Sequence, residues 1–115
     1  MKHVTRVGFI IADNDVGGHG RSVVNLATHL KEAGTEVEIA ALGGPGEHML
    51  AKSGIPYRIF PHWLERRIPH RRSIKGLVDH ARKRRWDLLH AFDLPAVNWT
   101  QVAARRLGLP AVTTI

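Results

Sequence analysis

Apolar and polar residues follow one another along the chain in short blocks that predict strands and helices in turn. Runs rich in β-branched and apolar residues predict five strands, at Val4–Ile11, Val37–Leu42, Pro56–Phe60, Asp87–Ala91 and Ala111–Ile115. Between them, apolar residues at helical spacing predict four helices, at Arg21–Ala33, Glu47–Ser53, Ser73–Arg84 and Pro95–Leu107. Three of these helices are expected to end at a glycine, at Gly34, Gly54 and Gly108.

The strict alternation of strands and helices predicts an α/β fold. We expect one domain with a Rossmann-like, doubly wound parallel sheet, helices on both faces and strand order 3-2-1-4-5. Ligands of such sheets bind beyond the carboxyl ends of the strands, where the strand order reverses. Here the reversal lies between the first and fourth strands. The loops Ala12–Gly20 and Phe92–Leu94 are therefore expected to face one crevice.

Two sets of residues in these loops are candidates for chemistry. Gly17 and Gly18 precede the first helix, where free backbone N–H groups suit a phosphate, although the same glycines could simply form a tight turn. The dinucleotide pattern G-x-G-x-x-G fails at Val23, and no P-loop is present. His90 ends the fourth strand and Asp93 follows it. Both could polarise a hydroxyl-bearing ligand, or His90 could be satisfied by backbone. The remaining histidines show no metal-ligand spacing, and we predict no metal site.

Charge separates one segment from the rest of the chain. The net charge is +7, and residues 62–85 account for all of it, because they hold nine cations against Glu65 and Asp79. The cations are Arg66, Arg67, Arg71, Arg72, Lys75, Arg82, Lys83, Arg84 and Arg85. Such a basic surface could meet an anionic membrane or be a solvated face. Nucleic acid is a weaker alternative, because no reader motif accompanies the charge.

Composition excludes several classes of protein. The chain has no cysteine, which excludes a disulfide scaffold, a thiolate metal site and a cysteine nucleophile. The apolar runs are shorter than the roughly 20 residues of a spanning helix, and no secretory signal is recognisable. We expect a cytoplasmic protein, with peripheral contact at the inner face of the membrane as an option left open by the basic segment.

Three stretches carry a resemblance to a known family. They are Gly17-Gly18 with Leu26-Ala27-x-x-Leu30 and Ala33-Gly34-x-x-Val37, then Trp86-Asp87-Leu88-Leu89-His90-Ala91, then Ala103-x-x-x-Leu107-Gly108-Leu109-Pro110-Ala111-Val112-Thr113-Thr114. In this order the chain resembles the N-terminal domain of retaining glycosyltransferases of the GT-B fold, the family-4 group. The resemblance covers nearly the whole chain, apart from residues 61–83.

The resemblance implies transfer of a hexose-type sugar from a nucleotide-diphosphate sugar to a hydroxyl acceptor, with no further cofactor. In such a domain Gly17 and Gly18 would reach the donor phosphates. The acceptor side would be lined by His19, Gly20 and Arg21, with His90 and Asp93 in the crevice. One departure is Phe92, which stands where family members often have a second histidine.

The resemblance also implies that the chain is incomplete. Family members continue past a strand like Ala111–Ile115 into an active-site histidine and a C-terminal domain that holds the donor. We therefore expect no sugar transfer by this chain alone, and a partner that is either the missing C-terminal domain or a separate donor-binding subunit. The last strand would leave an exposed sheet edge, through which the chain could form a homodimer. The alternative function is a non-catalytic α/β module that binds an anion or a partner chain.

Overall fold

The computed structural model describes residues 5–11, 19–41, 47–60, 71–92 and 94–114. Its strands are β1 (Arg6–Ile11), β2 (Glu36–Ala41), β3 (Tyr57–Ile59), β4 (Leu88–Ala91) and β5 (Ala111–Thr113). Its helices are α1 (His19–Glu32), α2 (Glu47–Ser53), α3 (Arg71–Arg84) and α4 (Leu94–Leu107). Each predicted strand and helix is therefore present, with bounds that shift by a few residues.

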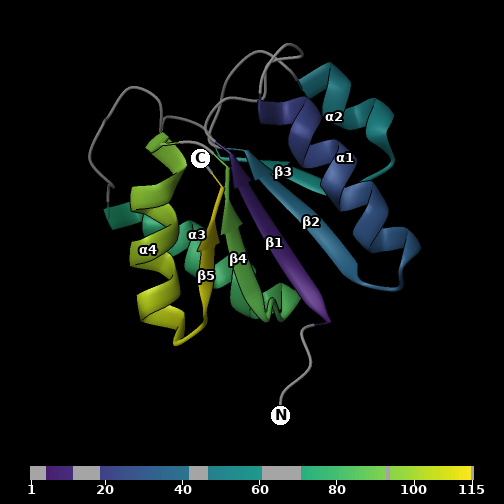
Figure 1. Ribbon diagram of the computed structural model, residues 1–115. Helices are drawn as coiled ribbons and strands as arrows, with labels where there is room; N and C mark the ends of the chain where they lie inside the picture. Colours follow the sequence, from purple (N-terminus) through teal and green to yellow (C-terminus); the bar gives the residue numbers. More distant parts are fainter. Residues whose placement is uncertain (1–4, 12–18, 42–46, 61–70, 93, 115) are drawn as a thin grey trace.

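The five strands form one parallel sheet in the order β3-β2-β1-β4-β5 (Figure 1). β1 lies at the centre and pairs with β2 along its whole length, from Arg6 opposite Glu36 to Ile11 opposite Ala41. On its other side β1 pairs with β4, where Phe9 lies opposite His90. The predicted strand order is confirmed, and the order reverses between β1 and β4.

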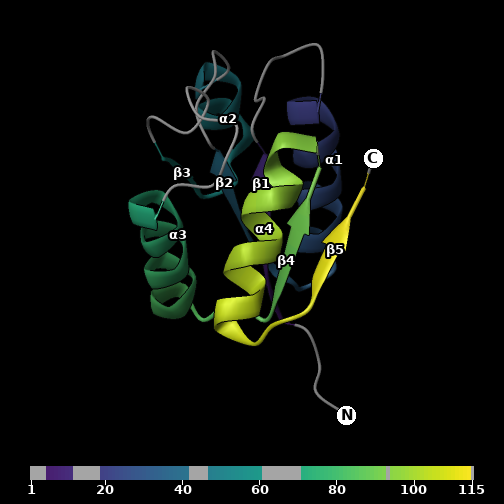
Figure 2. The ribbon, with the colours of Figure 1, turned by 90° about the vertical axis from the view of Figure 1, so that its left-hand side faces the viewer.

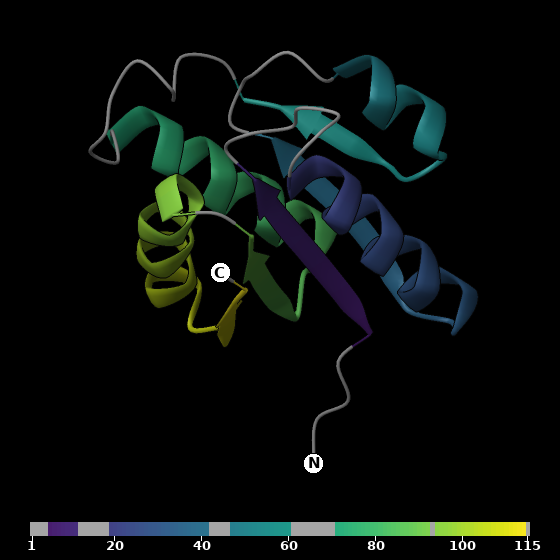
Figure 3. The same cartoon turned by 45° about the horizontal axis from the view of Figure 1, so that its top comes forward.

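Helices cover both faces of the sheet, because alternate strand residues point to opposite sides. Val7, Phe9 and Ile11 of β1 belong to the core under α1 and α2, which we call the α1 face. Ile10 belongs to a second core under α3 and α4, the α3 face. Figure 3 shows the two helix pairs on opposite sides of β1. The chain thus changes face between α2 and α3, as a doubly wound sheet requires.

Left-handed residues end the helices. Gly34 has a φ of 97° and follows α1, where the Thr35 N–H donates to the Leu30 carbonyl at 2.9 Å. α3 ends in the same way without a glycine: Arg85 has a φ of 57°, and the Trp86 N–H donates to the Ala81 carbonyl at 3.1 Å. This pairing is typical of helix ends with one left-handed residue, a conformation that costs a non-glycine residue free energy.

β5 forms one edge of the sheet (Figure 2). It pairs with β4 from Leu89 opposite Ala111 to Ala91 opposite Thr113, and all three of its residues are exposed. Among the described residues, Val112 is the one large hydrophobic side chain that is exposed, at 43%. The exposed edge expected at the last strand is present in the described part of the chain.

Candidate functional site at the carboxyl ends of β1 and β4

The reversal of strand order places the candidate crevice beyond β1 and β4. α1 follows β1 onto one face of the sheet, whereas α4 follows β4 onto the other. A pair of adjacent strands whose helices leave in opposite directions forms the crevice in which doubly wound folds bind ligands. The described residues at this point include His90 and Phe92, and α1 begins there at His19.

His90 is held between aromatic rings on the α1 face. Its ring stacks on Phe92, with centroids 4.5 Å apart and planes 25° apart, and it lies tilted against Phe9 at 5.5 Å. Phe9 and Phe92 in turn make an edge contact at 5.7 Å. Both phenylalanines are buried. The imidazole is therefore packed from two sides in a half-buried position at the end of the sheet.

The imidazole has one polar partner among the described residues, which is Thr114. The Nε2 atom of His90 lies 2.7 Å from the Oγ1 atom of Thr114, just beyond β5. Burial lowers the pKa of His90 below its ordinary value of 6.5, because the charged form is poorly solvated there. At neutral pH the ring is therefore neutral, with one nitrogen that donates and one that accepts a hydrogen bond.

Of the other predicted site residues, the structure describes some and leaves others outside the described ranges. Gly17, Gly18 and Asp93 lie outside the described residues, and their roles stay predictions. His19 and Gly20 form the start of α1, two residues earlier than the predicted helix, and Arg21 is exposed in its first turn. The predicted phosphate loop thus leads directly into a helix N-terminus, which is the arrangement that the phosphate prediction needs.

The described part of the basic segment spreads along α3. Arg66 and Arg67 lie outside the described residues, and Arg71 and Arg72 begin the helix. Lys75 forms an ion pair with Asp79 at 2.6 Å. The remaining cations are those from Arg82 to Arg85, at the opposite end of a 14-residue helix, roughly 20 Å away.

Two further arginines join the basic end of α3. An Nη2 atom of Arg82 lies 3.5 Å from the carbonyl oxygen of Arg106, the neighbour of Arg105 near the end of α4. All three of these side chains are exposed. The side of the sheet where the strands begin therefore carries cations from two helices. The net charge of residues 62–85 did not include Arg105 and Arg106 of α4.

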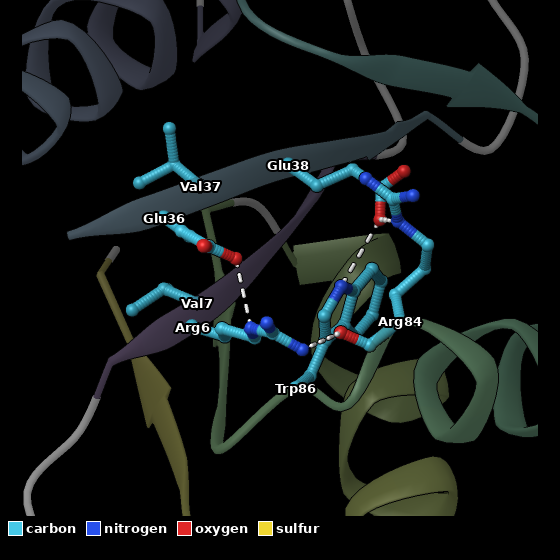
Figure 4. Close-up of a pocket in the computed structure, with 7 residues that line it drawn as sticks. All are labelled: Arg6, Val7, Glu36, Val37, Glu38, Arg84 and Trp86. Atoms are coloured by element: carbon cyan, nitrogen blue, oxygen red, sulfur yellow. Dashed lines mark hydrogen bonds and ion pairs between the residues drawn. The ribbon is translucent and has the colours of Figure 1, made fainter.

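Sequence reasoning missed a buried carboxylate at the amino ends of the strands. Glu38 of β2 is 7% exposed and accepts a hydrogen bond from Trp86 Nε1 at 3.0 Å (Figure 4). The same Oε1 atom lies 3.0 Å from His80 Nε2 and 3.6 Å from Arg84 Nε. A small pocket lies beside this cluster. The sequence feature that could have revealed this carboxylate is the charge of Glu38 inside the apolar run Val37–Leu42.

The pocket in Figure 4 is not the site that we favour. Its polar side chains are already engaged with one another, since Arg6 also pairs with Glu36 at 2.8 Å and donates to the Arg84 carbonyl. It opens at the amino ends of the strands, whereas doubly wound folds bind ligands at the carboxyl ends. We therefore assign the Glu38 cluster a structural role, in which it fastens the end of α3 to the sheet.

In the ranges that the structure describes, no three His, Cys, Asp or Glu side chains gather as metal ligands would. Over the same ranges, none of the helices combines the length and the apolar character needed to cross a membrane.

Comparison with solved structures finds glycosyltransferases. MurG of Acinetobacter baumannii superimposes with a TM-score of 0.77 at 17% identity, covering 95% of this chain and 34% of that one. HepE of Anabaena, solved with UDP and glucose, gives a TM-score of 0.75 at 15% identity, covering 96% of this chain and 29% of that one. The glycosyltransferase VinC, solved with dTDP, gives 0.68 at 22% identity, covering 94% and 34%. The chain spans about a third of the length of these proteins, and at such identities the likeness establishes the fold.

The sequence itself identifies the family. No curated protein matches the chain. The model of the family described as Glycosyltransferase Family 4, however, matches residues 16–115, which is most of the chain and includes α1 through β5. The resemblance inferred from the three sequence stretches is confirmed. The chain has the fold found in GT-B glycosyltransferases and belongs to Glycosyltransferase Family 4.

Proposed function

We propose that this chain forms the acceptor-side domain of a glycosyltransferase that moves a hexose-type sugar from a nucleotide-diphosphate sugar to a hydroxyl acceptor. The observation that carries the proposal is the family match over residues 16–115. The nucleotides named with two of the similar structures, UDP for HepE and dTDP for VinC, support a nucleotide sugar as the donor substrate.

The transfer breaks the bond between the anomeric carbon and the diphosphate, and forms one from the acceptor oxygen to that carbon. The nucleoside diphosphate leaves with the electron pair of the broken bond, and its departing oxygen takes the proton that the acceptor hydroxyl loses. A neutral imidazole at the crevice suits this reaction, because it can hydrogen-bond a sugar hydroxyl without placing a positive charge there. We assign this role to His90, whose pKa is lowered by burial, and place Asp93 beside the acceptor.

The start of α1 supports a role near the donor. Helix N-termini attract phosphate through unpaired N–H groups and the helix dipole. α1 begins at His19, immediately after the two glycines. We propose that Gly17 and Gly18 approach the donor diphosphate, and that His19, Gly20 and Arg21 line the acceptor side.

We further propose that a second domain or subunit holds most of the donor. Stabilising a departing diphosphate requires cationic groups fixed next to it. The cations at the C-terminal end of α3 lie at the amino ends of the strands, away from the candidate crevice. The chain spans about a third of the length of the similar glycosyltransferases, and we expect the 115-residue chain to transfer no sugar by itself.

The test is release of nucleoside diphosphate from a panel of UDP-, dTDP- and GDP-sugars. The 115-residue chain should release none above background. The protein that also carries the donor-binding domain should release it in the presence of a hydroxyl acceptor, and Gly18→Val should lower that rate at least about 100-fold, the scale of losing a positioned transition-state contact. Arg105→Gln is the matched control and should retain the rate, because Arg105 is exposed near the C-terminal end of α4, away from the candidate crevice. Full activity of Gly18→Val would refute the proposal.

A further inference from the structure

Thr114 is the one described residue outside β1 and β4 that makes a polar contact with the candidate site. β5 pairs with β4 so that His90 lies opposite Val112, and Thr114 comes two residues later, on the same side of the sheet. The Thr114 N–H donates to the Ala91 carbonyl at 2.9 Å, which fixes the backbone of Thr114 against the end of β4. The side chain is therefore held in place by the sheet before it meets the histidine.

The hydroxyl of Thr114 is the third group that contacts the imidazole of His90. Phe92 stacks on the ring and Phe9 tilts against it, so both phenylalanines limit its movement. These apolar contacts do not distinguish one ring nitrogen from the other. The contact of 2.7 Å between Thr114 Oγ1 and His90 Nε2 does distinguish them.

A hydrogen bond to one nitrogen of a neutral imidazole decides the chemistry of the other. If Nε2–H donates to the hydroxyl, Nδ1 is an acceptor; if the hydroxyl donates to Nε2, Nδ1 carries the proton and is a donor. The hydroxyl can take either role, so it occupies Nε2 in both tautomers, and Nδ1 remains without a partner among the residues that the structure describes.

We propose that Thr114 is a positioning residue: its hydroxyl occupies Nε2 of His90, fixes the orientation of the ring and leaves Nδ1 to hydrogen-bond a hydroxyl of the sugar acceptor. The part that concerns the acceptor rests on the proposed function. The part that concerns Nε2 does not, because it follows from the contacts between β4 and β5 alone.

Occupation of Nε2 is measured by the two ring ¹⁵N chemical shifts of His90 in the labelled 115-residue chain, above the pKa of the ring. Thr114→Val removes the hydrogen-bonding hydroxyl and should displace the Nε2 shift from its wild-type value. Thr114→Ser keeps the hydroxyl and should restore the wild-type shifts.

Thr113→Val is the matched control, because Thr113 is also exposed but points to the opposite face of the same strand end. It should leave the shifts of His90 unchanged. Backbone amide spectra of each variant report whether the sheet is intact. Identical His90 shifts in the wild type and in a folded Thr114→Val variant would overturn the proposal, as would an equal response to Thr113→Val.

The role toward the acceptor is tested in the protein that transfers sugar. Thr114→Val should raise the KM for the acceptor about fivefold and leave the KM for the nucleotide sugar unchanged, with recovery in Thr114→Ser. An unchanged acceptor KM would overturn that role. The two measurements fail separately: a change of the Nε2 shift without any sugar transfer contradicts the proposed function, whereas transfer without a change of the Nε2 shift contradicts the positioning by Thr114.

Discussion

Gly8 in the centre of β1 leaves room for Trp86, and replacing it by alanine should destabilise the fold. In Gly8 the position of a Cβ atom is on the α3 face of the sheet. A Cβ atom on this residue would lie 2.3–2.5 Å from three ring carbons of Trp86. Real Cβ atoms do not approach a ring so closely. The indole is 5% exposed and its Nε1 atom donates to Glu38 at 3.0 Å. The ring must therefore move, and the movement breaks its hydrogen bond to a buried carboxylate.

The cost follows from these contacts. Overpacking of a core costs about 1–3 kcal/mol, and losing a hydrogen bond to a charged group costs about 1.5–3 kcal/mol more. The lower backbone entropy of alanine in the unfolded chain offsets about 0.5–1 kcal/mol. We expect Gly8→Ala to lower the free energy of unfolding by about 3 kcal/mol, a large share of the stability of a small domain.

Urea unfolding followed by far-ultraviolet circular dichroism measures the change, with Gly76→Ala as the matched control. Gly76 lies inside α3, and a Cβ there would meet its nearest atoms, in Phe60, at 4.0 Å. Gly76→Ala should therefore stabilise the chain by up to about 1 kcal/mol. In a Trp86→Leu background the indole is gone, and Gly8→Ala should cost less than about 1 kcal/mol. A stable Gly8→Ala variant, or an equal cost in both backgrounds, would refute the reasoning.

Three further predictions concern the histidine, the sheet edge and the end of α3. Burial lowers the pKa of His90 below 6.5, so the unfolded chain binds more protons just below that pH. The free energy of unfolding should fall as the pH is lowered through 6.5, and His90→Asn should flatten this part of the curve in urea titrations, whereas an unchanged slope would contradict the burial. Val112→Lys at the exposed edge should shift self-association toward the monomer in sedimentation velocity. A wild type that is monomeric at high concentration would contradict self-association through this edge. Arg85→Gly should raise the free energy of unfolding by about 0.5–1 kcal/mol, because glycine adopts the left-handed conformation without a Cβ penalty; a loss would show that the side chain contributes more than the backbone.

The fold could be predicted because its signals are local. β-branched runs, helical spacing and glycines such as Gly34 each depend on a few neighbouring residues, and the alternation of elements restricts the sheet to few topologies. The end of α3 shows the limit of such signals. Arg85 takes the left-handed position that glycine usually fills, which a pattern based on glycine cannot find.

The contacts of the candidate site could not be predicted, because they join residues far apart in the sequence. The place of His90 near the end of a strand was predicted, and its role stays a prediction. Its contact with Thr114 was not predicted, since that contact depends on the register between β4 and β5. Glu38 was missed for a similar reason: its partners Trp86 and His80 come from a different part of the chain.

Gly8 and Phe9 are adjacent in β1 but face opposite sides of the sheet, so a change at one need not disturb the other. Gly8 contacts the ring of Trp86 on the α3 face, whereas the ring of Phe9 contacts His90 on the α1 face. β1 is paired along its length with β2 and along four residues with β4. Moving this central strand would disturb both ladders, whereas moving the indole disturbs one side chain. We therefore expect Gly8→Ala to shift the indole ¹⁵N–¹H signal of Trp86 while the ring ¹⁵N shifts of His90 stay as in the wild type. A change at His90 as large as that caused by Thr114→Val would show that the strand itself moves, and that stability on one face and the candidate site on the other are coupled through β1.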